Sequence, residues 1–186
     1  RVTSGVDAVL VGGSGAFSVL DEAPWIQQFI HTLGSLADSG FPTFASCFGF
    51  QAMVLALGGT IAHDEENAEV GSFILHSTQG AQQDPVFGIL PTQFIAQEGH
   101  KDRATTLPSS VINLAASDRC PYQAIRIPGK PVYATQFHPE LTSEGNRTRF
   151  ARYFDMYSQA FGQSQAESMM EAFQPSPETN ELLKRF

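Results

Sequence analysis

The chain has 186 residues, 42% of them hydrophobic and 16 of them glycine, which suits one compact domain with a sizeable core. Its formal net charge of −8 argues against a nucleic-acid or anionic-membrane partner and favours solubility. Two cysteines do not make a disulfide framework, and neither a signal peptide nor a long apolar run occurs, so the sequence predicts a cytoplasmic protein.

The first predicted element is a buried strand that runs directly into a glycine-rich loop. Asp7 to Val11 is nearly continuously apolar, and Gly12-Gly13-Ser14-Gly15 follows it. Because glycine has no side chain, a ligand can approach this backbone closely, and its amides can receive an oxyanion. A phosphate loop would need Lys-Ser or Lys-Thr after the glycines, and a dinucleotide loop a third glycine at the required spacing; this sequence has neither.

Two helices are predicted in the first third of the chain. The first runs from Pro24 to Ser39, where apolar residues recur at helical spacing, and we expect this stripe to pack on the core. The second covers residues 48–57 and ends at Gly58-Gly59. It follows a buried strand over residues 41–47, so a strand passes directly into a helix at this point.

Cys47 lies at the junction of that strand and helix. The free N–H groups and the dipole at the amino end of a helix favour a thiolate and can hold a developing oxyanion. A lone cysteine is more often a small buried hydrophobe, so the position alone leaves both interpretations open.

The second half of the chain is rich in short strands. They are predicted at residues 60–63, 70–76, 93–97, 111–115 and 122–127, with turns between them. Strands that alternate with helices early and a run of strands later predict an α/β fold. We expect an open, mixed, mostly parallel sheet with helices on both faces and a site at the carboxyl ends of its strands.

His138 lies at the end of a further strand, predicted over residues 131–138. Pro139 forces the residue before it into an extended conformation and cannot continue a sheet. Residues two apart in an extended chain point to the same side, so Glu140 can reach the imidazole and fix its tautomer. A histidine before proline is usually a loop residue, but together with Cys47 the pattern favours a nucleophile, a base and an orienting carboxylate.

The carboxyl-terminal part is predicted to be helical. Residues 146–161 carry aromatic side chains on one helical face and are expected to close a domain over residues 1–160. Residues 161–186 are predicted to form a tail with a pair of short helices joined by Pro175-Ser176-Pro177. We expect the tail to pack on its own domain, with a partner contact as the alternative.

These motifs, in this order, resemble the class I (triad-type) glutamine amidotransferases. Residues 12–15 stand where that family has a Gly-Gly-Pro-Gly loop, residues 45–51 where it has Gly-x-Cys-x-Gly-x-Gln, and residues 137–140 match its Phe-His-Pro-Glu. Residues 99–102 stand where relatives often have Ser-His-Gly-Asp. The likeness spans roughly residues 5–157, and the chain resembles the amidotransferase domain of GMP synthase as a stand-alone glutaminase domain.

The resemblance implies a flavodoxin-like fold and a specific chemistry. Cys47 would attack the side-chain amide of glutamine, His138 would shuttle the proton, and Glu140 would orient His138. The amides of Gly13 and Phe48 would hold the oxyanion. Substrate contacts are implied for Gly12, Gln51, Gly99, His100, Lys101 and Asp102. Neither a metal nor an organic cofactor is implied, since no Cys/His ligand spacing occurs.

The sequence departs from the family at Ala45, Ser14, Phe50 and Lys101, which leaves the reacting groups intact but affects the pocket. Three functions stay open. The chain hydrolyses L-glutamine and passes ammonia to a synthase partner; it cleaves γ-glutamyl compounds in a pocket widened near Phe50 and Lys101; or it binds without catalysis. Relatives have a further strand and helix ahead of the glycine loop, so the resemblance predicts a sheet that lacks its first strand. The sequence determines neither the ammonia acceptor nor the oligomeric state.

Overall fold

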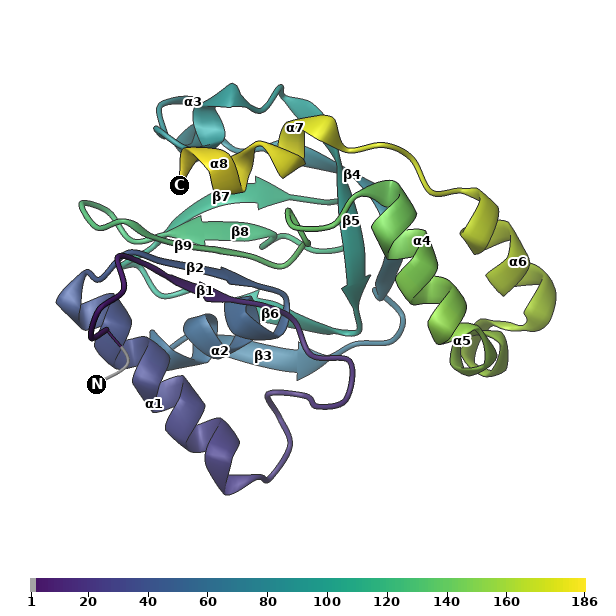
Figure 1. Ribbon diagram of the computed structural model, residues 1–186, viewed down its shortest axis with the longest axis horizontal. Coiled ribbons are helices and arrows are strands. Elements are labelled where there is room, and N and C mark those ends of the chain that lie inside the picture. Colours follow the sequence, from purple (N-terminus) through teal and green to yellow (C-terminus); the bar gives the residue numbers. More distant parts are fainter. Residues whose placement is uncertain (1–2) are drawn as a thin grey trace.

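The computed structural model describes residues 3–186 and shows an α/β fold built around one central sheet (Figure 1). This sheet has seven strands, and β3 and β6 form a separate two-stranded sheet. In spatial order the seven strands are β1 (Val9–Val11), β2 (Thr43–Ser46), β9 (Val132–Thr135), β8 (Ala124–Arg126), β7 (Ile112–Ala116), β4 (Glu69–Ser77) and β5 (Gln93–His100). The other elements are β3 (Thr60–His63), β6 (Asp102–Thr106), α1 (Pro24–Ser39), α2 (Phe48–Ala56), α3 (Gln79–Gln82), a 3₁₀ turn (Phe87–Ile89), α4 (Ser143–Arg152), α5 (Phe154–Phe161), α6 (Gln163–Glu171), α7 (Pro177–Asn180) and α8 (Leu182–Arg185).

The central sheet is mixed, as predicted. β1, β2 and β9 pair in parallel, whereas β8, β7, β4 and β5 each pair antiparallel with the neighbour before them. Five of the seven strands, β1, β2, β9, β7 and β5, therefore point the same way. Short connections explain the antiparallel pairs: only residues 127–131 join β8 to β9, too few for the crossover that a parallel pair needs.

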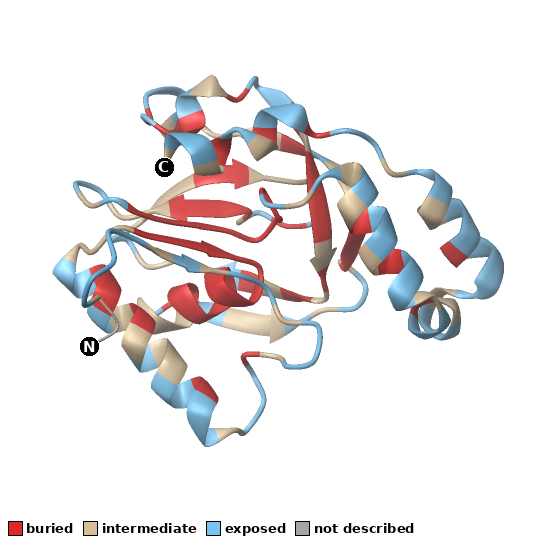
Figure 2. Ribbon diagram, in the orientation of Figure 1, coloured by how far each residue is buried: buried red, intermediate tan, exposed pale blue. Residues whose placement is uncertain are grey.

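Helices cover both faces of the sheet, which confirms the predicted layers. Successive side chains of a strand point to opposite faces, so Ala45 packs with α1 and α2 while Phe44, one residue earlier, packs on the other side. There its ring and that of Tyr133 contact Phe186, which follows α8. Figure 1 shows α1 and α2 on one side and α3 and α8 on the other, and Figure 2 shows β2 and β9 buried between them.

Most of the predicted elements are confirmed. α1 has the predicted bounds, and β2 and α2 meet at Cys47. β6 was not predicted because its sequence is polar, and it pairs with β3 outside the central sheet. The strand predicted over residues 131–138 ends earlier, at Thr135, whose Oγ1 donates to Phe137 O at 2.8 Å in a turn.

The prediction of one helix over residues 146–161 was wrong, because the chain breaks at Tyr153 into α4 and α5. The break allows the rings of Phe150 and Tyr157 to stack with centroids 4.4 Å apart. Beyond them α6, α7 and α8 follow, and Asn180 of α7 donates to Pro139 O at 2.8 Å, close to the predicted catalytic segment. The division into domains at residue 160 stays a prediction.

One edge of the central sheet is formed by β1. Among residues 3–186 no strand precedes β1, and its Leu10 is 65% exposed. With three residues, the strand offers few unpaired backbone groups to another chain. None of the helices within residues 3–186 is both long enough and apolar enough to cross a membrane.

Candidate active site

Cys47 occupies a sharp turn between β2 and α2. Its backbone has φ 52° and ψ −105°. Among residues 3–186 it is the only residue other than glycine that has a positive φ. Such a conformation is strained and persists only where neighbouring contacts fix it. Here Cys47 N donates to Thr135 O at 2.8 Å, and Cys47 O accepts from Gln51 N at 3.0 Å. The thiol is therefore held at the amino end of α2.

A glycine at position 49 lets α2 lie close to the sheet. A Cβ there would lie 2.7 Å from Val11 Cγ1 and 3.1 Å from Ala45 Cβ. Any larger residue would push α2 off the sheet and move the thiol with it. The methyl group of Ala45, where the family pattern has glycine, is fully buried in the core beside α2.

His138 and Glu140 form a close pair on the segment that follows β9. His138 Nδ1 lies 2.6 Å from Glu140 Oε1, and Ser46 Oγ donates to the same oxygen at 3.2 Å. Because the carboxylate accepts, Nδ1 carries the proton of this bond and Nε2 is directed to the other side of the ring. Ser46, directly before Cys47, was not predicted to take part.

The charges around His138 favour its protonated form. Burial lowers the pKa of this histidine, but negative charge on Cys47 and Glu140 outweighs burial and raises it to about 9. Burial in turn raises the pKa of Glu140, and the hydrogen bond and charge of His138 bring it below its usual value. Imidazolium and carboxylate are therefore the favoured charge states near neutral pH.

The glycine loop lies directly over Cys47 and His138. A Cβ on residue 13 would be 2.8 Å from His138 Cε1 and 3.3 Å from Cys47 Cβ, so only glycine fits without a shift. A Cβ on Gly12 would meet no described atom within 4 Å, and Gly12 lines neither cavity at the site. Phe48 begins α2, where amides lack intrahelical partners.

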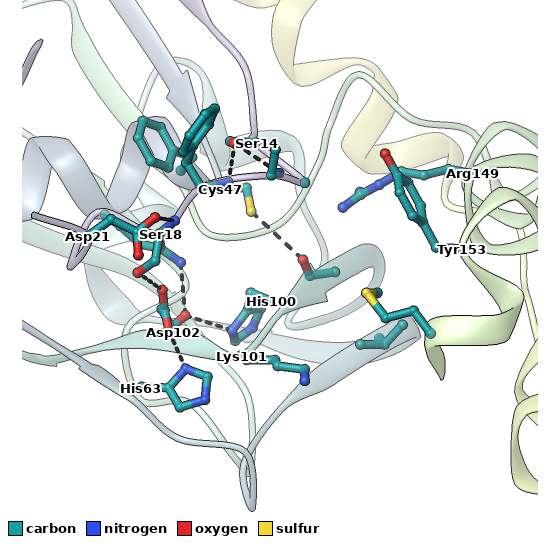
Figure 3. A pocket seen from close by; sticks show the side chains of 18 of the residues that line it. Ser14, Ser18, Asp21, Cys47, His63, His100, Lys101, Asp102, Arg149 and Tyr153 are labelled. Carbon is teal, nitrogen blue, oxygen red and sulfur yellow. Dashed lines mark hydrogen bonds and ion pairs between the residues drawn. The ribbon is translucent and has the colours of Figure 1, made fainter. Parts of the chain in front are cut away.

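A cavity of about 350 Å³ opens in front of Cys47 (Figure 3). The glycine loop and the start of α2 form one side, residues 99–102 a second, and α4 and α5 a third. Figure 3 shows Arg149 and Tyr153 across the cavity from His63 and Asp102. This volume is at the small end for ligand pockets and suits a small metabolite.

Several predicted substrate-binding side chains border the cavity but are already bonded within the protein. Gln51 Nε2 donates to Asp102 O at 2.9 Å, and His100 Nδ1 lies 3.0 Å from the same carbonyl. The carboxylate of Asp102 lies 2.7 Å from His63 Nδ1 and also accepts from Ser18 Oγ. The hydrogen bond between His63 and Asp102 raises the pKa of His63. His63 stands outside the sequence motifs and was not predicted to be at the site, but the structure brings it to the cavity.

The other predicted positions differ in where they point. Gly99 presents its carbonyl to Cys47 Sγ at 3.9 Å. Lys101 lines the cavity, but its Nζ donates to Glu65 at 2.9 Å. A pocket widened near Phe50 would favour the γ-glutamyl alternative, but Phe50 is fully buried in the core with α1 and α2 and lines neither cavity.

Arg149 is at the site although the sequence analysis did not select it. Its Nη1 lies 3.2 Å from His138 Nε2, and its guanidinium is about 3 Å from where a Gly99 Cβ would be. Within residues 3–186 no carboxylate lies within ion-pair distance of it. A signal existed, because Arg149 shares a helical face with Asn146, Phe150 and Tyr153, where a charge is unexpected.

Comparison with known proteins shows the family to which a chain with this fold and site belongs. A profile of the family described as Glutamine amidotransferase class-I matches residues 3–156, so the chain belongs to this family. It is 31% identical over 149 residues to GMP synthase [glutamine-hydrolyzing] of Vibrio atlanticus, which covers 80% of this chain and 27% of that protein. It is also 31% identical over 156 residues to one of the subunits of GMP synthase [glutamine-hydrolyzing] from Thermoplasma volcanium, covering 82% and 69%.

The chain spans about a quarter of the length of the first curated relatives it matches, 24% and 27% in two cases. Solved structures agree on the fold. A glutamine amidotransferase from Thermotoga maritima superposes with a TM-score of 0.70 at 16% identity, over 96% of this chain and 75% of that one. One from Methylobacillus flagellatus superposes with a TM-score of 0.66 at 20% identity, over 77% and 55%.

Proposed function

We propose that the chain hydrolyses the side-chain amide of glutamine through a cysteinyl-glutamyl thioester and releases glutamate and ammonia. The observation that carries this proposal is the strained turn that holds Cys47 at the amino end of α2, with the paired His138 and Glu140 beside it. Strain of this kind gathers at functional sites. A cysteine kept only for packing would not need a positive φ.

In the first step a lone pair of Cys47 Sγ forms a bond to the amide carbon, and the π electrons of the C=O bond move to the carbonyl oxygen. The amides of Gly13 and Phe48 would donate to this oxyanion, and the tight approach of residue 13 to Cys47 supports that role. His138, whose pKa is raised to about 9, then gives its Nε2 proton to the departing nitrogen, and ammonia leaves.

In the second step water resolves the thioester. His138, now neutral, takes a proton from the water, the hydroxide adds to the thioester carbon, and the Cys47 thiolate leaves with glutamate as the product. Glu140 keeps Nδ1 protonated throughout and stabilises the imidazolium whenever it forms. Each cycle therefore consumes one water and returns Cys47 and His138 to their starting states.

Arg149 is our candidate for the residue that holds the substrate carboxylate. Its guanidinium is at the cavity wall beside Gly99 and has no carboxylate partner among the described residues. Arg149 Nη1 lies 3.2 Å from His138 Nε2, so the guanidinium opposes the imidazolium that the negative charges of Cys47 and Glu140 favour. A bound carboxylate would draw the guanidinium away and free Nε2 for the reaction.

The ammonia acceptor is proposed to be a separate synthase. The relatives from Thermoplasma volcanium and Methanocaldococcus jannaschii are subunits of GMP synthase, and their names describe that enzyme as glutamine-hydrolysing. We propose that the present chain likewise serves as the glutaminase of a two-part enzyme. Both of its cysteines are free, which fits the reducing cytoplasm where we place it.

A γ-glutamyl peptidase is the second candidate, favoured by a further cavity. This cavity, of about 420 Å³, adjoins the first across Ser14 and Gly15 and reaches His138. Arg152 lines this cavity and not the first, and its charge could bind the carboxylate of a larger leaving group. Glutamine held by Arg149 would leave Arg152 without a role.

Glutamate release from L-glutamine and from a set of γ-glutamyl dipeptides, measured with the wild-type chain and Cys47→Ala, separates the candidates. Release from glutamine that disappears in Cys47→Ala supports the amidotransferase half-reaction, and a preference for the dipeptides supports the peptidase. Binding of glutamine without turnover, unchanged in Cys47→Ala, would overturn both and favour a non-catalytic binding module.

A further inference from the structure

Behind the wall of the active-site cavity lies a second polar cluster, made of Glu69, Glu98 and His100. Glu69 is the direct cross-strand partner of His100 in the antiparallel pair β4 and β5. Glu98 is two residues before His100 on β5, so both side chains point to the same face. All three side chains are at most 1% exposed. The register of two strands therefore gathers three potential metal ligands in the interior.

The hydrogen bonds of His100 fix which nitrogen faces the carboxylates. Nδ1 lies 3.0 Å from Asp102 O, and because a carbonyl only accepts, Nδ1 carries the proton. Nε2 lies 3.1 Å from Glu69 Oε2 and 3.6 Å from Glu98 Oε2. In the neutral imidazole Nε2 carries a lone pair, which here faces the lone pairs of two carboxylates. Such an arrangement requires a cation or protons between them.

Among residues 3–186, three of the four carboxylate oxygens lack a hydrogen-bond partner. Within the described part of the chain, both oxygens of Glu98 and Oε1 of Glu69 are buried without a hydrogen bond. Native proteins rarely leave such groups unpaired, and each case needs an explanation such as an ion. Burial, followed by the charges of Glu69 and Cys47, raises the pKa of Glu98 well above its usual value, so a proton is the competing occupant.

We propose that Glu69, Glu98 and His100 bind one divalent transition-metal ion of the zinc type. One imidazole nitrogen and two carboxylate oxygens are ligands that Zn²⁺ accepts, and their atoms all lie within 4.8 Å of one another. The separations of 3.1 and 3.6 Å from Nε2 bracket the edge of about 3.3 Å that bonds of about 2.0 Å give in a tetrahedral site. Gln123 Nε2 donates to Glu69 Oε2 and would orient that ligand.

The site has a structural role and does not depend on the proposed reaction. Glu98 and His100 flank Gly99, whose carbonyl faces Cys47 Sγ. An ion bound by Glu98 and His100 of β5 and by Glu69 of β4 would connect the two strands and hold Gly99 in place in the cavity wall. Cys/His spacing along the chain does not reveal the cluster, because two ligands are carboxylates and the third meets them only through strand register.

The test measures bound metal in the full chain. Cys47→Ala is the parent, because a free thiolate can itself bind zinc. The protein is produced in zinc-supplemented medium, dialysed against a weak chelator and assayed for zinc by mass spectrometry. Mg²⁺ is measured in the same samples as a negative control, because imidazole does not favour that ion. We expect about one zinc per chain in the parent and about tenfold less with Glu98→Gln added. Glu65→Gln, which removes an exposed carboxylate, is the matched control and should change nothing.

A second measurement does not rely on any variant at the cluster. The parent is unfolded and refolded with Zn²⁺ or with chelator, because a buried site loads as the chain folds, and its melting temperature is compared. A higher melting temperature with zinc is expected. Zinc content below about a tenth of an equivalent in the parent, equal content in Glu98→Gln, or identical melting temperatures would overturn the proposal and leave protons as the occupants.

Discussion

Replacing Gly13 with alanine tests whether the glycine loop acts directly on the reacting atoms. A Cβ at this position would be 2.8 Å from His138 Cε1. Carbon atoms in contact are normally about 3.5 to 4.0 Å apart, so the loop or the imidazole must move by about 0.7 Å or more. The imidazole cannot move freely, because Glu140 holds its Nδ1 at 2.6 Å and Gln97 O accepts from its backbone amide at 2.9 Å.

The displacement should therefore fall on the loop and its amide. A misplacement of about 1 Å in an active site costs about 10²-fold in rate. Loss of one oxyanion donor costs about 10² to 10³-fold. We expect kcat/KM for glutamine to fall about 10²-fold in Gly13→Ala, or roughly 3 kcal/mol of transition-state stabilisation. The melting temperature should change little, because residue 13 is exposed.

Gly12→Ala is the matched control for this prediction. Its Cβ would meet no described atom within 4 Å, and alanine keeps the backbone amide, so activity should stay within about threefold of wild type. Steady-state glutamate release with both variants decides the matter. Equal losses in the two variants, or an unimpaired Gly13→Ala, would refute the view that the loop contacts the transition state.

Three further predictions concern charge at the same site. Glu140→Gln leaves the shape of the His138 pair but removes its charge, and kcat should fall on the order of 10² to 10⁴-fold in the glutaminase assay. Arg149→Gln should raise KM for glutamine about 10-fold or more with a smaller effect on kcat, whereas the exposed Arg147→Gln should leave both unchanged; steady-state kinetics of the two variants compare them. The pKa of His138 is about 9 in the folded chain and 6.5 in the unfolded one, so its protonation stabilises the fold fully below about pH 6.5 and this stability is lost as pH rises through about 9. Urea unfolding should show that the free energy of unfolding falls as pH rises between these values. The fall should be smaller in Cys47→Ala, because this variant lacks the negative charge that raises the pKa of His138.

Local patterns in the sequence were sufficient to predict where Cys47, His138 and Glu140 lie. The change from a strand period to a helix period placed Cys47 on a turn, and the two-residue spacing placed Glu140 beside His138. These predictions worked because each depends on neighbours in the chain. The backbone strain at Cys47 and the approach of Gly13 depend on contacts between distant segments, which no local pattern contains.

The same limit explains which contacts the sequence did not predict. His100 and Lys101, grouped as substrate contacts from their place in a motif, both line the cavity, but strand register also brings His100 to Glu69, and Lys101 pairs with Glu65. Glu98 would be taken for a surface residue by its type, yet it is fully buried. Register between β4 and β5 decides the surroundings of His100 and Glu98, and the sequence does not specify register in a strand pair with polar residues on both sides.

The site is thus assembled from strand ends and a loop on one side and from helices on the other, and changes in the two parts should have different effects. The carboxyl ends of β2 and β9 and the glycine loop bring Cys47, His138 and Gly13 together, and in the proposed mechanism their geometry sets what bond can be broken. α4 and α5 supply the opposite wall, with Arg149 and Tyr153 facing the cavity. That wall can change without moving the nucleophile, because α4 begins after the catalytic segment and packs on β4 through its own cluster around Phe150. Substrate choice between glutamine and larger γ-glutamyl compounds should therefore follow changes in α4 and α5 and leave the chemistry at Cys47 the same.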